Sequence, residues 1–133
     1  SFGWHGYRRN LFSHAGAIYW DTNKGLVLFY RNKAVACIGF HCEDGLVIVK
    51  QMQGVRGNEE FLKGLRWDRL LLKTVIESAR ILGYAGVQVL PGRRNQWCSV
   101  SREKTFYVRY DVSAKREGLK LDITGDVYSI NFS

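Results

Sequence analysis

Apolar runs alternate with short polar turns over the first half of the chain, and this pattern predicts antiparallel strands. Residues 26–30 and 34–42 are apolar and β-prone, and the polar triplet 31–33 between them suits a tight reversal. Residues 43–45 (Glu-Asp-Gly) are a second hairpin signal. The segment 46–53 that follows begins with four consecutive aliphatic residues. A run that is apolar on both faces favours a central strand, so we expect three sequential strands with the third inside the sheet.

The spacing of apolar residues then changes to a helical period. One stripe contains Phe61, Leu65, Leu72, Val75, Ile76, Ala79 and Leu82. Asn58 is a good N-cap residue, and Gly83 suits the C-terminal stop. Gly64 costs about 1 kcal/mol relative to alanine inside a helix. The pattern therefore predicts one long central helix, with residues 59–62 either part of it or a separate turn before a start near Leu65.

The last part of the chain predicts a short strand, a second helix and a hairpin. Residues 86–90 are β-prone and are closed by Pro-Gly. Because a strand, a helix and another strand form a βαβ unit, the strands 46–53 and 86–90 should be parallel. Residues 106–117 suit a helix stopped by a glycine. Apolar residues alternate on both sides of the turn 124–126, which indicates a terminal β-hairpin.

These elements define an α+β fold with a mixed sheet in a single domain, residues 1–133. Residues 1–17 are glycine-rich, and we expect them to form an irregular N-terminal arm, followed by residues 18–20 and a turn at 21–25. A chain of 133 residues buries enough surface for one core. No apolar run reaches the roughly 20 residues of a membrane helix. We therefore expect no membrane association.

The cysteines Cys37, Cys42 and Cys98 form no CxxC pair. An odd count without such a pair argues against a disulfide framework and against a zinc ribbon, so we expect no metal. Cys37 lies in a strand pattern and is expected to be a buried small hydrophobe. This cysteine usage favours a reducing compartment, hence the cytoplasm.

Charge is strongly positive, with a formal net charge of +8. Residues 91–120 contain eight basic residues against three acidic ones. A local field of this kind attracts nucleic acid, a phosphorylated ligand or an acidic protein partner, although a solvated face that aids solubility has the same composition. Trp97, Phe106 and Tyr107 lie among the cations, and such a mixture suits base stacking beside phosphate contacts. The candidate nucleic-acid contacts are Arg93, Arg94, Arg102, Lys104 and Arg109.

From residue 26 to residue 132 the order of elements resembles the GNAT superfamily of acyl-CoA-dependent N-acyltransferases. The resemblance is one of layout: antiparallel strands, a glycine-containing turn, a helix, a strand, a late helix and a hairpin. It implies that 86–90 splays away from 46–53 and leaves a V-shaped gap. Residues 109–119 are similar to the family's late helix. The family's N-terminal strand and two helices have no recognisable counterpart before residue 18.

The turn after the third strand resembles the family's Gln/Arg-x-x-Gly-x-Gly/Ala motif. Gln51 to Gly57 fits its first part, but Arg56 stands where a small residue is expected, and a second half-match lies at 63–67. In the family, backbone amides at this helix start bind the pyrophosphate of the cofactor. The resemblance therefore implies acetyl-CoA or another acyl-CoA, bound by Gln51, Gly54, Arg56, Gly57, Gly64 and Arg66. A structural turn without a ligand explains the same residues.

An N-acyltransferase needs a base for the amine acceptor and an acid for the leaving thiolate. The family often places a tyrosine acid four residues before the glycine of the late helix. Here that position is Ala114, which cannot donate a proton, so Tyr110 is the best candidate, with Tyr107 as an alternative. His41 and Glu43 are the candidate bases.

The sequence thus supports an N-acyltransferase-like domain with an incompletely matched catalytic motif. The alternatives are a basic module that binds nucleic acid or an acidic protein, and an interaction domain without a small ligand.

Overall fold

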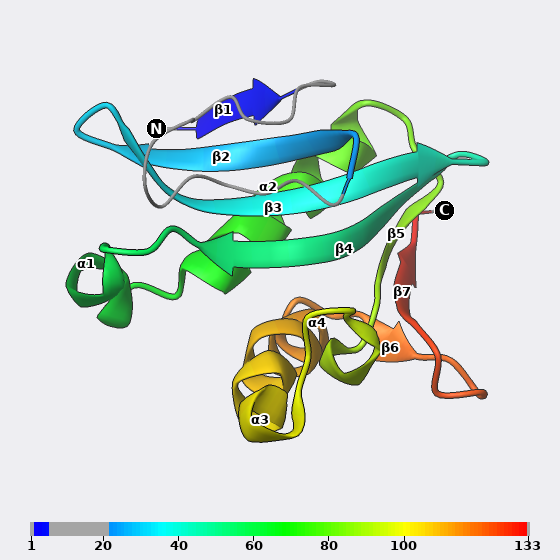
Figure 1. The fold of residues 1–133 in the computed structure, drawn as a ribbon. Helices are drawn as coiled ribbons and strands as arrows, with labels where there is room; N and C mark the ends of the chain where they lie inside the picture. Colours follow the sequence, from blue (N-terminus) through cyan, green and yellow to red (C-terminus); the bar gives the residue numbers. More distant parts are fainter. Residues whose placement is uncertain (1, 6–21, 133) are drawn as a thin grey trace.

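A mixed seven-stranded sheet with the strand order β1-β2-β3-β4-β5-β7-β6 organises the protein (Figure 1). The computed structural model describes residues 2–5 and 22–132. Within them the strands are β1 (Phe2–His5), β2 (Lys24–Tyr30), β3 (Lys33–Glu43), β4 (Leu46–Gly54), β5 (Gly86–Val89), β6 (Lys120–Leu121) and β7 (Tyr128–Asn131). Strands β1 to β4 are antiparallel neighbours, β4 and β5 are parallel, and β7 pairs antiparallel with both β5 and β6. The predicted α+β fold, the parallel βαβ unit and the terminal hairpin are confirmed.

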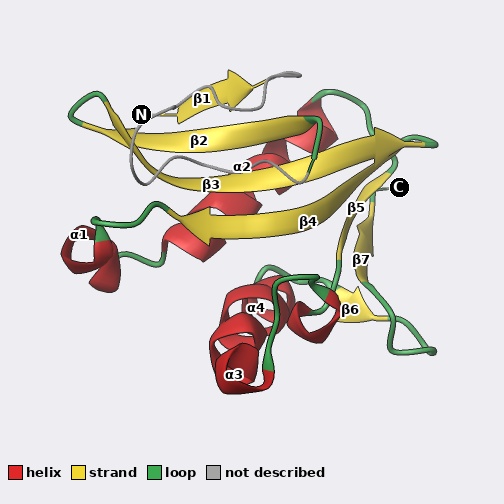
Figure 2. Ribbon diagram, viewed as in Figure 1, coloured by secondary structure: helices red, strands yellow, loops and turns green. Residues whose placement is uncertain are grey.

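The helices follow β4 and β5 in the chain (Figure 2). They are α1 (Glu59–Lys63), α2 (Trp67–Ile81), the 3-10 turns η1 (Gly92–Arg94) and η2 (Val100–Arg102), α3 (Glu103–Phe106), the π-helical segment η3 (Tyr107–Val112) and α4 (Ser113–Arg116). The last three are consecutive, and we call residues 103–116 the late helix. No helix in the described part of the chain is long and apolar enough to cross a bilayer.

The central helical pattern is divided, because α1 and α2 are separate elements. The side chain of Asn58 does not cap α1. Instead its Nδ2 donates to the carbonyl of Val55 (2.9 Å), while its backbone carbonyl accepts from the amide of Leu62 (2.9 Å). Gly64 follows α1 directly, and α2 begins at Trp67, two residues beyond the predicted start.

The prediction of an irregular arm over residues 1–17 is wrong for Phe2–His5. These residues form β1 and pair antiparallel with β2, from Phe2 opposite Leu28 to His5 opposite Gly25. A four-residue strand containing a glycine has little intrinsic signal, and the neighbouring strand supplies the hydrogen bonds that define it. The rest of the arm, with residues 18–20, lies outside the described residues.

The main core lies between one face of the sheet and the helices. Leu26, Ile38 and Met52 from the strands meet Leu72 and Val75 of α2, and all five are at most 1% exposed. Phe106, Tyr110 and Ala114 of the late helix belong to the same core. The opposite face of the sheet has a smaller cluster of Val27, Cys37 and Val55. Cys37 is fully buried, as predicted, and all three cysteines are free.

The parallel strands β4 and β5 separate halfway along β4. They are paired from Leu46 opposite Gly86 to Val49 opposite Val89, and the amide of Leu90 makes a last bond to the carbonyl of Val49 (3.3 Å). Strand β4 continues to Gly54, whereas the chain after β5 turns away. The late helix lies beside this separated end of β4 (Figure 1). The predicted splay is therefore present.

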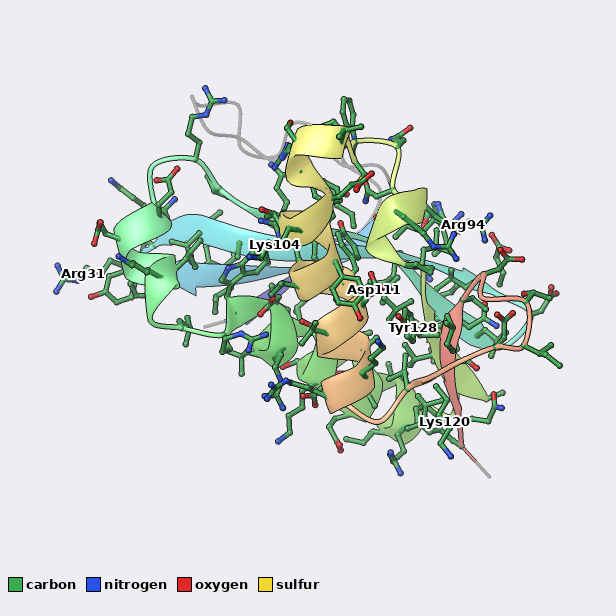
Figure 3. All side chains as sticks on the ribbon, turned by 90° about the horizontal axis from the view of Figure 1, so that it is seen from below. Arg31, Arg94, Lys104, Asp111, Lys120 and Tyr128 are labelled. Carbon is green, nitrogen blue, oxygen red and sulfur yellow. The ribbon has the colours of Figure 1, made fainter. Side chains whose placement is uncertain are left out.

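The late helix is attached to the β5–β7 side of the sheet by one buried carboxylate. Asp111 accepts hydrogen bonds from the amide of Gly92 (2.8 Å) and from the hydroxyl of Tyr128 (2.6 Å). Figure 3 shows the side chains of Asp111 and Tyr128 next to one another where the late helix passes β7. Contact is close, because a Cβ added to Gly92 would lie 2.5 Å from the carbonyl oxygen of Phe106. A glycine is therefore needed at position 92.

Candidate functional site

A cleft of about 1200 Å³ opens where β4 and β5 separate. One wall is the end of β4 and the turn after it, from Gln51 to Arg56. Residues of α1 and the start of α2 line one side, and Asn95, Trp97 and the late helix line the other. The splay of β4 and β5 thus leaves one edge of β4 without a strand neighbour, and the cleft lies between this edge and the helices.

Tyr110 occupies this exposed edge of β4. Its hydroxyl accepts a hydrogen bond from the amide of Met52 (2.7 Å) and lies 3.3 Å from the carbonyl of the same residue. Asn95 supports this arrangement, because its Nδ2 donates to the Tyr110 hydroxyl (3.0 Å) and to the carbonyl of Lys50 (3.2 Å). The side chains of Tyr110 and Asn95 therefore form the hydrogen bonds with the β4 backbone that a neighbouring strand would otherwise make.

The π-helical segment accounts for the reach of Tyr110. Within Tyr107–Val112 the extra residue per turn changes which side chains face inward, so that the adjacent Tyr110 and Asp111 are both buried. Tyr110 then points to β4 and Asp111 to β5–β7. Single π-helical turns of this kind are common at functional sites. Ala114, the position of the family's acid, is fully buried in the core.

Arg109, the neighbour of Tyr110, carries its charge into the cleft. Its Nη1 donates to the carbonyl of Met52 (3.3 Å), and its guanidinium lies 5.1 Å from the ring centroid of Trp67 and 5.8 Å from that of Phe106. Burial lowers the pKa of this guanidinium from its ordinary value, and nearby Arg102 acts in the same direction. The side chain is held by aromatic faces and one carbonyl, rather than by a carboxylate.

Two carboxylates of the protein fill the positions where the turn and the helix start offer backbone amides. Glu59 accepts from the amide of Gly57 (3.0 Å), a residue whose φ of +95° favours glycine. Hydrogen bonds from backbone amides, its own first and that of Gly57 second, hold the pKa of the Glu59 carboxyl below its ordinary value. Asp68 accepts from the amide of Arg69 (2.9 Å) and lies 3.4 Å from Nε of Arg66.

The predicted cofactor residues are only partly gathered. Gln51, Gly54, Arg56 and Arg66 line the cleft, together with Tyr110. Gly57 and Gly64 belong to the connection between β4 and α2 but are not among the lining residues. The sequence motif therefore lies along one wall of the cleft, while the amide of Gly57 is already bonded to Glu59.

The two candidate bases lie elsewhere. His41 is opposite Ile48 and Glu43 is opposite Leu46, in the part of β4 that is still paired with β5. Met52 lies four residues further along β4, which is about 13 Å for an extended strand. His41 Nδ1 is 3.2 Å from Oδ1 of Asn23. The structure does not bring these two side chains to Tyr110.

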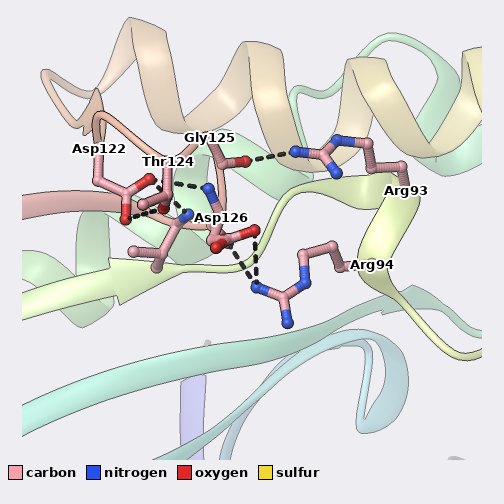
Figure 4. A network of polar contacts seen from close by, with 7 residues as sticks. Arg93, Arg94, Asp122, Thr124, Gly125 and Asp126 are labelled. Carbon is pink, nitrogen blue, oxygen red and sulfur yellow. Dashed lines mark hydrogen bonds and ion pairs between the residues drawn. The ribbon is translucent and has the colours of Figure 1, made fainter.

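The basic segment is divided between two places. Arg93 bonds to the carbonyl of Gly125, and Arg94 donates to the carbonyl of Asp126 (3.0 Å) and lies 3.6 Å from its carboxylate, so both hold the terminal hairpin loop (Figure 4). Arg102 and Arg109 line the cleft instead, and Lys104 lines a small groove beside it. The five candidate nucleic-acid contacts are therefore divided between the hairpin loop, the cleft and the small groove beside it.

Sequence reasoning missed Asn95 and Asp68, and it considered Arg109 only as a contact of the alternative nucleic-acid module. Asn95 lies in a segment without periodicity, and its partners Lys50 and Tyr110 are 45 and 15 residues away. Asp68 has the ordinary signature of a carboxylate in a first helical turn. Across residues 2–5 and 22–132, no group of three or more His, Cys, Asp or Glu side chains is placed to hold a metal ion.

The splayed parallel pair, the helix after β4 and the late helix beside the opening together define the GNAT fold. Solved structures bear this out. The GNAT family N-acetyltransferase YhbS from Escherichia coli, in complex with CoA, has a TM-score of 0.54 over 84% of this chain and 60% of its own, at 14% identity. The PaiA N-acetyltransferase of Thermoplasma acidophilum, in complex with coenzyme A, has a TM-score of 0.51 over 81% of this chain and 60% of its own, at 13% identity. A Bacillus subtilis acetyltransferase in complex with CoA has a TM-score of 0.54 over 83% of this chain and 77% of its own, at 12% identity.

This similarity establishes the fold. The chain spans about 60% of the length of the first two of these structures. No family model matches the sequence, and no curated protein matches it either. Similarity in arrangement without similarity in sequence is consistent with the departures at Arg56 and Ala114 from the family's motifs.

Proposed function

We propose that the protein binds an acyl-CoA in the cleft between β4 and β5 and acts as an N-acyltransferase-like domain. One observation carries this proposal: β4 extends five residues, Lys50 to Gly54, beyond its last pairing with β5, and this edge borders a cleft of about 1200 Å³. A strand edge suits an extended ligand chain that contains amides. The CoA complexes of three proteins with the same fold support the choice of ligand.

Electrostatics support a phosphorylated ligand. Arg56, Lys63 and Arg66 line the cleft from the turn, α1 and the start of α2, while Arg102 lines it from the other side. Guanidinium groups bind phosphate in a bidentate manner. Because Glu59 and Asp68 already accept from the amides of Gly57 and Arg69, we expect arginine side chains to make more of the phosphate contacts here than backbone amides do.

The proposed reaction is acyl transfer to an amine. The amide of Met52 faces the cleft and would donate to the thioester oxygen, stabilising the charge that develops when the amine attacks. The hydroxyl of Tyr110, now bonded to that amide, would be displaced and would donate its proton to the leaving thiolate, and the proton released by the amine would restore the hydroxyl. The described lining residues include no histidine, so the amine would have to arrive uncharged or pass its proton to water or to one of the lining carboxylates, Glu59, Glu60 or Asp68.

Calorimetric titration with CoA, acetyl-CoA and a short oligonucleotide at two salt concentrations tests the proposal. We expect CoA and acetyl-CoA to bind, and saturating either at about 100 times its Kd should stabilise the fold by about 2.7 kcal/mol. Arg66→Ala should weaken binding, whereas Lys73→Ala, which removes the same charge from an exposed position of α2 outside the cleft, should not. Absence of CoA binding, with oligonucleotide binding that collapses as salt rises, would instead support the nucleic-acid module.

A further inference from the structure

We propose that the cleft selects acyl-CoA donors whose acyl chain ends in a carboxylate, and that Arg109 binds this carboxylate. The inference rests on the proposed function, because it names the substrate class of the same cleft. Arg109 then determines specificity for the acyl chain, whereas Arg56 and Lys63, the cations at the rim of the cleft, suit the phosphates.

Arg109 lines the cleft and contacts β4 at the middle of its unpaired edge, residues 50–54. Its Nη1 donates to the carbonyl of Met52 (3.3 Å), and the amide of that same residue bonds to Tyr110 (2.7 Å). The amide is the group that we propose for the thioester oxygen. Arg56 and Lys63 lie beyond the end of this edge, on the turn after Gly54 and on α1. Position along β4 therefore assigns Arg109 to the acyl group and the rim cations to the phosphates.

The charge of Arg109 has no acidic partner within the part of the chain that the structure describes. The ion pairs there are Arg66–Asp68, Arg69–Glu117 and Arg94–Asp126. Asp68 attracts Arg109 from a distance, but its carboxylate is engaged by Arg66 and by the amide of Arg69. A partly buried cation that lacks a counter-ion is costly, and a ligand carboxylate would supply one.

The surroundings of Arg109 orient its guanidinium group. The guanidinium lies over the rings of Trp67 and Phe106, so aromatic contacts orient the plane without using its N–H donors. One donor bonds to Met52, and the remaining donors are suited to a planar, bidentate acceptor. A carboxylate has this shape, and a neutral alkyl chain would leave the donors without an acceptor.

The distance favours a short chain. A thioester oxygen on the Met52 amide and a carboxylate on Arg109 would be separated by about one residue of extended strand, roughly 3.3 Å, plus the hydrogen bonds at each end. Two methylene groups span this separation. The favoured donor class is therefore a short dicarboxylic acyl-CoA of the succinyl type.

Calorimetric titration with CoA, butyryl-CoA and succinyl-CoA separates this inference from the proposed function. The two acyl groups have the same number of carbons and differ at the terminal carboxylate. We expect succinyl-CoA to bind the natural protein at least about tenfold more tightly than butyryl-CoA. Arg109→Met keeps an unbranched side chain over Trp67 and Phe106, and it should abolish the preference while changing CoA affinity by less than about twofold. Arg102→Met, at a neighbouring cation of the cleft, should retain the preference.

Each other outcome has a distinct meaning. If none of the three ligands binds, the proposed function fails and this inference fails with it. If CoA binds but butyryl-CoA and succinyl-CoA bind equally, the inference alone is overturned, and this comparison needs no variant to fold. If Arg109→Met weakens CoA itself as much as succinyl-CoA, Arg109 contacts the phosphates and the inference is again overturned.

Discussion

At the scale of single residues, the cleft depends on the hydroxyl of Tyr110. It satisfies the Met52 amide of an edge that has no strand neighbour, and it accepts from Asn95 as well. Tyr110 is only 2% exposed. Because a buried donor that loses its acceptor is costly, this hydroxyl should matter for stability as well as for the proposed chemistry.

Tyr110→Phe tests this role. Removing the hydroxyl leaves the Met52 amide without its acceptor, so we expect the free energy of unfolding to fall by about 1–3 kcal/mol. Urea denaturation measures the change. The control is Tyr107→Phe, one turn earlier, whose hydroxyl bonds to Lys115 at the surface and whose loss should change stability by less than about 0.5 kcal/mol. Equal stability of Tyr110→Phe and the natural protein would mean that water replaces the hydroxyl.

At the scale of elements, the sequence predicted those whose pattern is local. The strands from Lys24 to Gly54 and the parallel unit around α2 have unambiguous alternation or helical spacing, and their existence was correctly predicted. The π-helical segment was not predictable, because residues 106–117 suit an α-helix and the distortion depends on what Tyr110 and Asp111 must reach. Asn95 and Arg109 acquire their roles from partners 45 and 57 residues away. Such contacts leave no trace in local periodicity.

The junction between the late helix and β7 gives a pH-dependent prediction. Burial first, and then the hydrogen bond and the charge of Asp111, raise the pKa of Tyr128 above its ordinary value of about 10. A raised folded-state pKa means that this contribution to stability is complete below about pH 10 and is lost as pH rises further, because only the unfolded state then releases the proton.

Comparison with Tyr128→Phe isolates this effect from other groups that titrate in alkali. We expect the natural protein to be more stable than the variant at pH 8, and the difference to shrink by up to about 1.4 kcal/mol for each pH unit above 10. Urea denaturation at pH 8, 10 and 11 measures it. A difference that stays constant over this range would show that Tyr128 ionises equally in the folded and unfolded states.

At the scale of the whole molecule, the question is whether the net charge of +8 or its local placement attracts anions. Figure 3 shows labelled cations on well-separated parts of the surface, among them Arg31, Arg94 and Lys120. The long-range field of such a protein steers any anion towards it. If the ligand binds in the cleft, its affinity should depend instead on the cations that line the cleft.

Two double variants that remove the same charge distinguish these cases. Arg56→Ala with Arg66→Ala takes two cations from the cleft, while Arg93→Ala with Arg94→Ala takes two from the hairpin loop that they hold. Both lower the net charge equally. We expect the first pair to reduce CoA affinity by about tenfold or more, with little loss of stability, because charge-assisted bonds to phosphate are lost. The second pair should reduce the melting temperature and leave CoA affinity nearly unchanged. Calorimetry and thermal unfolding measure both quantities, and an equal loss of affinity in the two variants would show that the overall field, rather than the cleft, attracts the ligand.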